Sequence, residues 1–280
     1  MTPDAAGLMT GSQRFDVREF TRTAVGTHRD RLDLAALAAR PLPVDAARAV
    51  RVLRDLEAAT MDRLRNVLVT ATHKDARVTA FLVSWAFEKF WIADALTAIA
   101  EAQPEAQHAA VEASPVTDAA TSRGRAERRA RRGPVRRSLS GFLAGESIVA
   151  VHVASGLVDD GMLRATYERV IELSDNPEIA RALGEVIDLK ARHSRFFEEE
   201  AVHRLLESPR AVRLTRRELR RDVLPIGAIA LAPSDRVFFT GFTFAGDSGV
   251  ERARRVAASV ADLPGMDDGT VHAVQLRLAA

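Results

Sequence analysis

The sequence predicts an all-α protein with four long helices followed by several shorter ones. Apolar residues recur at helical spacing along most of the chain, and few stretches alternate with a period of two. Prolines and capping residues divide the helical segments from one another. The 280 residues are 47% apolar and 28% charged, which excludes wholesale disorder and suffices for one large domain or two small ones.

The first two long helices are expected before Pro104. A polar N-terminal arm over residues 1–44 precedes them, and Asp45 is a candidate N-cap. The stretch 46–71 carries apolar residues on one helical face. The second helix, over 78–102, contains the sequence "FLVSWAFEKFWIADAL" and ends before the proline.

A linker over residues 103–137 separates the second helix from the third. Its part 123–137 holds eight arginines and one glutamate, a net charge of +7, whereas the whole chain carries +2 and the remainder therefore −5. The run has no aromatic residue for base stacking. We therefore interpret it as a solvated linker and expect no nucleic-acid partner.

The third and fourth long helices are expected over 138–174 and 178–206, joined by the turn "SDNP". A C-terminal helical extension over 207–280 contains shorter helices and the apolar connection "LPIGAIALAP". No apolar run approaches the length that spans a bilayer, so we expect a cytoplasmic protein without a membrane partner. The absence of cysteine excludes disulfides, thiolate metal sites and a cysteine nucleophile.

Each long helix has an ionisable residue near the middle of its apolar face. These residues are Glu57 on the first helix, Lys89 on the second, Asp160 on the third, and Lys190 with His193 on the fourth. For any single helix, a misassigned face would leave the charge in solvent. Four such helices in succession favour an inner location, where a charge costs several kcal/mol unless it is paired. We therefore expect these side chains to meet at the centre of a bundle.

The motifs around these residues resemble those of the ferritin-like di-iron carboxylate superfamily, which includes rubrerythrins and ribonucleotide reductase small subunits. The segment "VIDLKARHSRFF" is similar to the family motif DExRHxxFY, and "WAFEKFWIADAL" is similar to WxYEExWHxExL. The segment "DDGMLRATYERVIELSDNP" is similar to NExTxxxxYxxLxxxTxDP, with Asp160 in the glutamate position and Tyr167 in the tyrosine position. The resemblance covers residues 45–206. It implies a ferritin-like four-helix bundle with a long crossover between helices two and three.

The chain departs from the family at the metal ligands. The six ligand positions that the resemblance implies hold Glu57, Lys89, Ile92, Asp160, Lys190 and His193. Two of the three lysines in the chain occupy positions where the family has glutamate. Two carboxylates would then balance two ammoniums, which would repel a divalent cation. We therefore expect no di-iron centre, and the function that we favour needs no metal and no cofactor.

Three functions remain open from the sequence. The first, which we favour, is a metal-independent enzyme acting on a small organic molecule, with Lys89 and Lys190 as general acids or amine nucleophiles. The supporting residues would be bases or orienting groups (Glu57, Asp160, His193), a supporting tyrosine (Tyr167) and substrate contacts (Trp85, Ile92). The second is a non-catalytic scaffold that acts through its surface, as a homodimer or in a complex. The third is an oxidoreductase with one metal on Glu57, Asp160 and His193.

Overall fold

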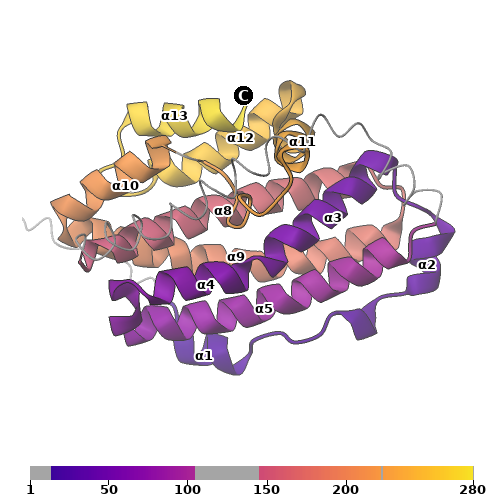
Figure 1. Ribbon diagram of the computed structural model, residues 1–280, viewed down its shortest axis with the longest axis horizontal. Coiled ribbons are helices and arrows are strands. Elements are labelled where there is room, and N and C mark those ends of the chain that lie inside the picture. The colour runs from indigo at the N-terminus through magenta and orange to yellow at the C-terminus, as the bar shows by residue number, and fades with distance from the viewer. Residues whose placement is uncertain (1–13, 105–144, 222, 280) are drawn as a thin grey trace, which may run out of the picture.

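The computed structural model describes residues 14–104, 145–221 and 223–279, and this part of the chain consists of helices and connections without a β-strand. The long helices lie side by side along one axis (Figure 1). They are α3 (Val44–Ala58), α4 (Thr60–Leu68), α5 (Ala76–Glu101), α8 (Ser147–Glu172) and α9 (Pro177–Glu207). The prediction of an all-α protein is thus confirmed.

The helix boundaries follow local capping signals. The side chain of Asp75 accepts a hydrogen bond from the backbone of Val78 and begins α5, and Asn176 caps α9 in the same way before Pro177. The helix expected over 46–71 is divided in two at Ala59, which ends α3 and precedes α4. The linker beyond residue 104 and the first part of the expected third helix, 138–144, lie outside the described residues.

The N-terminal segment belongs to the packed fold, which differs from the expected polar arm. It contains α1 (Val17–Arg22), the 3₁₀ helix η1 (Arg29–Arg31) and α2 (Leu34–Ala39), and it runs along α5 (Figure 1). Phe15, Phe20, Leu37 and Leu42 are buried. These residues are separated by charged ones and form no continuous periodic stripe, which is why the sequence pattern did not indicate their burial.

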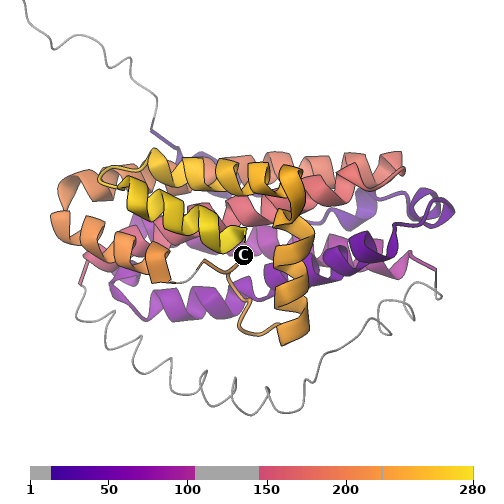
Figure 2. The same ribbon diagram turned by 90° about the horizontal axis from the view of Figure 1, so that it is seen from above.

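The C-terminal helices form a layer over α8 (Figures 1 and 2). They are α10 (Pro209–Arg221), α11 (Pro233–Phe244), α12 (Gly246–Ala261) and α13 (Asp268–Leu278), the last of which the sequence pattern did not indicate. The connection between α10 and α11 is only partly buried, because Ala228 and Leu231 lie inside whereas Leu224 and Ile229 are exposed. No helix in the described ranges is long and apolar enough to cross a membrane.

Two apolar clusters occupy the two ends of the bundle. One contains Phe81, Trp85 and Phe196, and the other contains Ile92 and Leu163. Along α5 and α9, the charged residues singled out from the sequence fall between the residues of these two clusters, and on α8 Asp160 lies close to the boundary between them. The bundle therefore has a polar layer near its centre, with one apolar cluster on each side.

Candidate functional site: a buried ion-pair network

Glu57 of α3 lies between the two buried lysines. Its Oε2 atom is 3.0 Å from Nζ of Lys89 on α5, and its Oε1 atom is 3.0 Å from Nζ of Lys190 on α9. All three side chains have an exposed fraction of 0%. The ion pairs thus join three helices through one carboxylate, at the place where the sequence predicted an inner charged cluster.

Two consecutive aspartates of α8 complete the network. Asp160 accepts a hydrogen bond from Lys190 at 3.0 Å, as the sequence led us to expect. Asp159, which the sequence reasoning missed, accepts one from Lys89 at 3.3 Å and a second, at 2.7 Å, from the backbone of Ile226. The network therefore has three carboxylates and two ammoniums, instead of the expected two and two.

The charge balance is restored if one carboxyl group holds a proton. Burial raises the pKa of Asp160, although the two lysines act in the opposite direction. Burial also acts to raise the pKa of Glu57, but Lys190 and Lys89 outweigh it and the pKa lies below its ordinary value. Asp160 is therefore the member of this pair of carboxyl groups that more readily takes up a proton.

Lys89 is held in its charged form. Burial acts to lower the pKa of Lys89, but Asp159, Glu57 and Asp160 outweigh it and raise the pKa above its ordinary value. The ammonium also lies 4.7 Å from the ring centroid of Trp85, within cation–π distance. Trp85 thus contacts a member of the network, whereas Ile92 lies in the apolar core with an exposed fraction of 0%.

Tyr167 donates a hydrogen bond to the network. Its hydroxyl lies 2.9 Å from Oε1 of Glu57, and the ring is fully buried. Burial and the neighbouring Glu57 carboxylate raise the pKa of Tyr167 well above its ordinary value. Tyr167 is therefore a neutral donor that supports Glu57, and the structure brings it together with the other predicted site residues.

His193 and Glu88 form a second buried pair beside the network. Nε2 of His193 lies 2.6 Å from Oε2 of Glu88, and both side chains have an exposed fraction of 0%. Burial raises the pKa of Glu88 to about 7, while the backbone N–H of Val25 and the guanidinium of Arg192 act in the opposite direction. Burial, Lys190 and Lys89 together lower the pKa of His193 well below its ordinary value. The sequence indicated His193 but not Glu88.

The N-terminal segment covers this pair. The backbone N–H of Val25 donates to Oε1 of Glu88 at 2.8 Å, and the ring of Phe20 meets the His193 ring edge-on at 5.9 Å. Arg192 donates to the hydroxyl of Thr23 at 3.0 Å. The pair is thus closed off by residues from the part of the chain that the sequence described as a polar arm.

Two polar atoms between the pair and the network lack a hydrogen-bond partner among the described residues. They are Nδ1 of His193 and Oδ2 of Asp160, and they lie 3.9 Å apart, too far for a direct hydrogen bond. Across the ranges that the structure describes, no group of three or more histidine, aspartate or glutamate side chains is placed to hold a metal ion. The three-residue metal site considered from the sequence, Glu57 with Asp160 and His193, is not among such groups.

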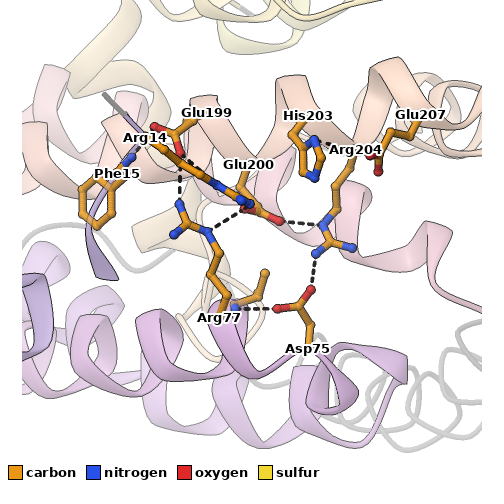
Figure 3. A network of polar contacts seen from close by, with 10 residues as sticks. Arg14, Phe15, Asp75, Arg77, Glu199, Glu200, His203, Arg204 and Glu207 are labelled. Atoms are coloured by element: carbon orange, nitrogen blue, oxygen red, sulfur yellow. Dashed lines mark hydrogen bonds and ion pairs between the residues drawn. The ribbon is translucent and has the colours of Figure 1, made fainter. Parts of the chain in front are cut away.

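A separate polar cluster joins the start of α5 and α9 to Arg14 and Phe15 of the N-terminal segment (Figure 3). Glu200, which is 1% exposed, lies 2.8 Å from Nε of Arg204 and 3.3 Å from Nε of Arg77. Arg204 also pairs with Asp75, the capping residue of α5. Glu200, Glu199 and Asp75 all pair with arginine, whereas Glu207 pairs with His203, so we assign the cluster a structural role at the end of the bundle.

Two small surface cavities lie away from the lysines. One, between η1, α5 and α9, is lined by His28, Arg31 and Ile99 among others. The other, of about 20 Å³, is lined by residues that include Trp85 and His152, and it has room for little more than a water molecule. Neither cavity is lined by Lys89 or Lys190.

Comparison of the chain with protein-family models, with curated proteins and with solved structures found no match. The assignment of a function therefore depends on the geometry of the site.

Proposed function

We propose that this chain is a metal-free protein of ferritin-like architecture whose central ion-pair network is structural, and that the protein acts through its surface. The observation that carries the proposal is the pairing of both fully buried lysines, each with two carboxylates. The proposal of a ferritin-like architecture rests on the motif resemblance and on the long helices lying side by side along one axis. The donor set does not fit a di-iron centre, because lysine or isoleucine stands at three of the six ligand positions.

The protonation of Lys89 supports a structural role over amine chemistry at this residue. A lysine that attacks a carbonyl group must be unprotonated, which requires a pKa lowered toward neutrality. The pKa of Lys89 is instead raised by the carboxylates around it. The ammonium is therefore a fixed positive charge that holds Glu57 and Asp159 together.

The network also explains why charges were kept in an apolar core. Buried ion pairs seldom stabilise a protein more than well-packed apolar residues of the same volume, but they can specify how elements pair. Glu57, Lys89, Asp160 and Lys190 come from four different helices. Only one alignment of these helices satisfies all of them, so the network selects that alignment.

A variant without network charges tests the proposal. We would replace the five residues together by uncharged ones of similar size (Glu57→Gln, Lys89→Met, Asp159→Asn, Asp160→Asn, Lys190→Met). If the network is structural, this variant should stay helical and lose less stability than Lys89→Met alone, which should cost about 3–5 kcal/mol. Circular dichroism with urea unfolding measures both.

The same variant separates a structural protein from an enzyme. Purified protein would be incubated with a mixture of small-molecule metabolites, and the composition of the mixture would be compared by mass spectrometry before and after. No compound should be consumed by the wild-type protein. Consumption by the wild type that disappears in the folded, uncharged variant would overturn the structural proposal.

Acid–base catalysis at Glu88 and His193 is the second candidate function. It is favoured by the pKa of about 7 for Glu88 and by the unpartnered Nδ1 atom of His193, since a general base works best near the ambient pH. In the metabolite experiment, this candidate predicts a conversion that is lost in His193→Gln and retained when only the lysine network is neutralised. A conversion unaffected by His193→Gln would contradict it.

A further inference from the structure

Helix α10 has a row of arginines on its outer side. Ala211, Thr215 and Leu219 are buried and mark the inner side of the helix. Arg213, Arg217 and Arg221 are exposed and follow one another at intervals of four residues, which places them in a row along the helix. We call these three residues the arginine stripe. The helix lies at the outer edge of the C-terminal layer (Figures 1 and 2).

The charges of the arginine stripe are not balanced by acids. None of the three guanidiniums makes an ion pair in the ranges that the structure describes, whereas their neighbours Arg216 and Arg220 both pair with Asp267. Arg277 of α13 adds a further positive charge, because it donates to the backbone carbonyl of Arg221 at 2.6 Å. The one acid exposed on α10, Glu218, follows Arg217 directly and stands three residues before Arg221, but it forms no ion pair with either among the described residues.

Several other exposed arginines pair with an acid on their own helix. Arg22 lies 2.7 Å from Glu19, Arg65 lies 3.2 Å from Asp62, and Arg254 lies 2.5 Å from Glu251. These arginines have acids three residues away on their own helices. The arginine stripe differs from these three residues, because none of its guanidiniums forms an ion pair with a described acid. Exposed Arg18 also forms none, but it does not belong to a row.

Large apolar side chains are exposed at both ends of α10. Leu206, three residues before the helix, is 71% exposed, and Leu224, three residues after it, is 40% exposed. An exposed leucine taken alone needs no explanation. Leu206, at the end of α9, and Leu224, in the connection after α10, add exposed apolar side chains at the two ends of the arginine stripe. Membrane-surface segments combine basic and large apolar side chains in this way.

We propose that α10 docks the protein on a membrane surface that contains anionic phospholipids. Guanidinium groups bind phosphate through two parallel hydrogen bonds, and each arginine near an anionic leaflet contributes about 1 kcal/mol. Leu206 and Leu224 would enter the interface between headgroups and acyl chains. A nucleic acid would also satisfy the arginines, but it would leave the leucines without a role.

This inference rests on the proposal that the protein acts through its surface, and it names the partner. The expectation from the sequence that the protein has no membrane partner depended on the absence of a spanning segment. Peripheral docking needs no such segment, since the contact is made by the surface of a folded helix.

Vesicle sedimentation tests the proposal. The full chain would be mixed with vesicles of phosphatidylcholine alone or with about 30% phosphatidylserine. We expect binding to the anionic vesicles only, and weaker binding at higher salt. Replacing the arginine stripe (Arg213→Gln, Arg217→Gln, Arg221→Gln) should lower the partition coefficient of the protein onto the anionic vesicles about 100-fold.

A matched variant controls for net charge. Replacing three exposed, paired arginines elsewhere (Arg22→Gln, Arg65→Gln, Arg254→Gln) changes the net charge equally and should leave binding within about threefold of wild type, because screened surface charges act locally. An equal loss of vesicle binding in both triple variants would overturn the proposal. Vesicle binding that survives replacement of the arginine stripe would also overturn it, because the binding site would then lie in another segment such as the arginine-rich linker. Absence of vesicle binding would also overturn it, while leaving the structural role of the network untouched.

The leucines distinguish a membrane from a nucleic acid. The variant Leu206→Ser with Leu224→Ser should weaken vesicle binding and leave the affinity for a duplex DNA probe unchanged. If the wild type binds the duplex but not the vesicles, and the stripe variant loses that binding, the partner is a nucleic acid and the membrane proposal is wrong.

Discussion

Nε2 of His193 lies 2.6 Å from Oε2 of Glu88, and one proton shared between these two buried atoms satisfies both. The pKa of Glu88 is raised to about 7 and that of His193 is lowered well below its ordinary value, so the folded pair keeps its proton on the carboxyl side in weak acid. In the unfolded chain the same proton belongs to the imidazole, whose pKa is about 6.5. Folding therefore transfers this proton from the imidazole of His193 to the carboxyl group of Glu88 without releasing it to solvent.

The variant His193→Gln isolates the acid of this pair. Glu88 then titrates with a folded pKa of about 7 and an unfolded pKa of about 4.5. The folded state binds more protons in that window, so stability should fall as the pH rises from about 4.5 to about 7, by at most about 1.4 kcal/mol per pH unit. Urea unfolding at several pH values within this window measures the slope.

The variant Glu88→Gln isolates the histidine, and the sign reverses. His193 stays neutral when folded but takes up a proton below about pH 6.5 when unfolded, so stability should fall as the pH is lowered through that value. The raised pKa of Asp160 affects both variants alike, and the difference between their slopes removes it. Equal slopes in the two variants would contradict a shared proton.

Tyr167 should not ionise in the folded protein. Burial and the Glu57 carboxylate raise its pKa well above its ordinary value, and it is the only tyrosine in the chain, so its absorbance is unambiguous. An alkaline titration followed by ultraviolet absorbance should show tyrosinate only when the protein unfolds. A native-state transition near pH 10, the value for a free tyrosine, would show that the hydroxyl does not face Glu57.

Replacing one buried lysine alone should cost more stability than replacing the lysine together with its carboxylate partner. Lys190→Met leaves Glu57 and Asp160 without one of their cations and should destabilise the protein by about 3–5 kcal/mol. Adding Asp160→Asn should recover part of this loss, because a buried charge is then removed as well. Lys74→Met, at an exposed position, serves as the control and should change stability by less than about 0.5 kcal/mol. Urea denaturation compares the three.

Gly156 sets the distance between α8 and α9. A Cβ atom at this position would lie 2.7 Å from the ring of Phe197, so Gly156→Ala should destabilise the protein by about 1–3 kcal/mol. At Gly184, inside α9, an added Cβ meets no atom within 4 Å. Gly184→Ala should therefore stabilise the protein by about 0.5–1 kcal/mol through helix propensity alone. Thermal unfolding of both variants checks the opposite signs.

The sequence predicted the helical class and five ionisable members of the central cluster, because a charge at the middle of an apolar helical face must be paired. The sixth member, Tyr167, was predicted from the motif resemblance. It did not predict Glu88 or Asp159, each of which is adjacent in sequence to a predicted residue. Adjacent residues in a helix point about 100° apart, so a single apolar face contains only one of them. Both members of each pair are buried because α5 and α8 carry buried residues on all sides.

The contacts made by the N-terminal segment also could not be predicted from the sequence. Phe20 and Val25 reach His193 and Glu88 from residues that are far away along the chain. No local pattern encodes such a contact, because it depends on where the segment crosses α5. The signal that could have indicated it was the presence of Phe15 and Phe20 in a segment otherwise rich in charge.

Asp159 receives the backbone N–H of Ile226 on one oxygen and the ammonium of Lys89 on the other. The connection that leads into the C-terminal layer is thereby attached to the ion pairs of the bundle. Detachment of that layer would leave a buried carboxylate short of a donor, which is costly. The two layers should therefore unfold as one cooperative unit, and the Ile226 amide should exchange its hydrogen with solvent as slowly as the amides of the central helices.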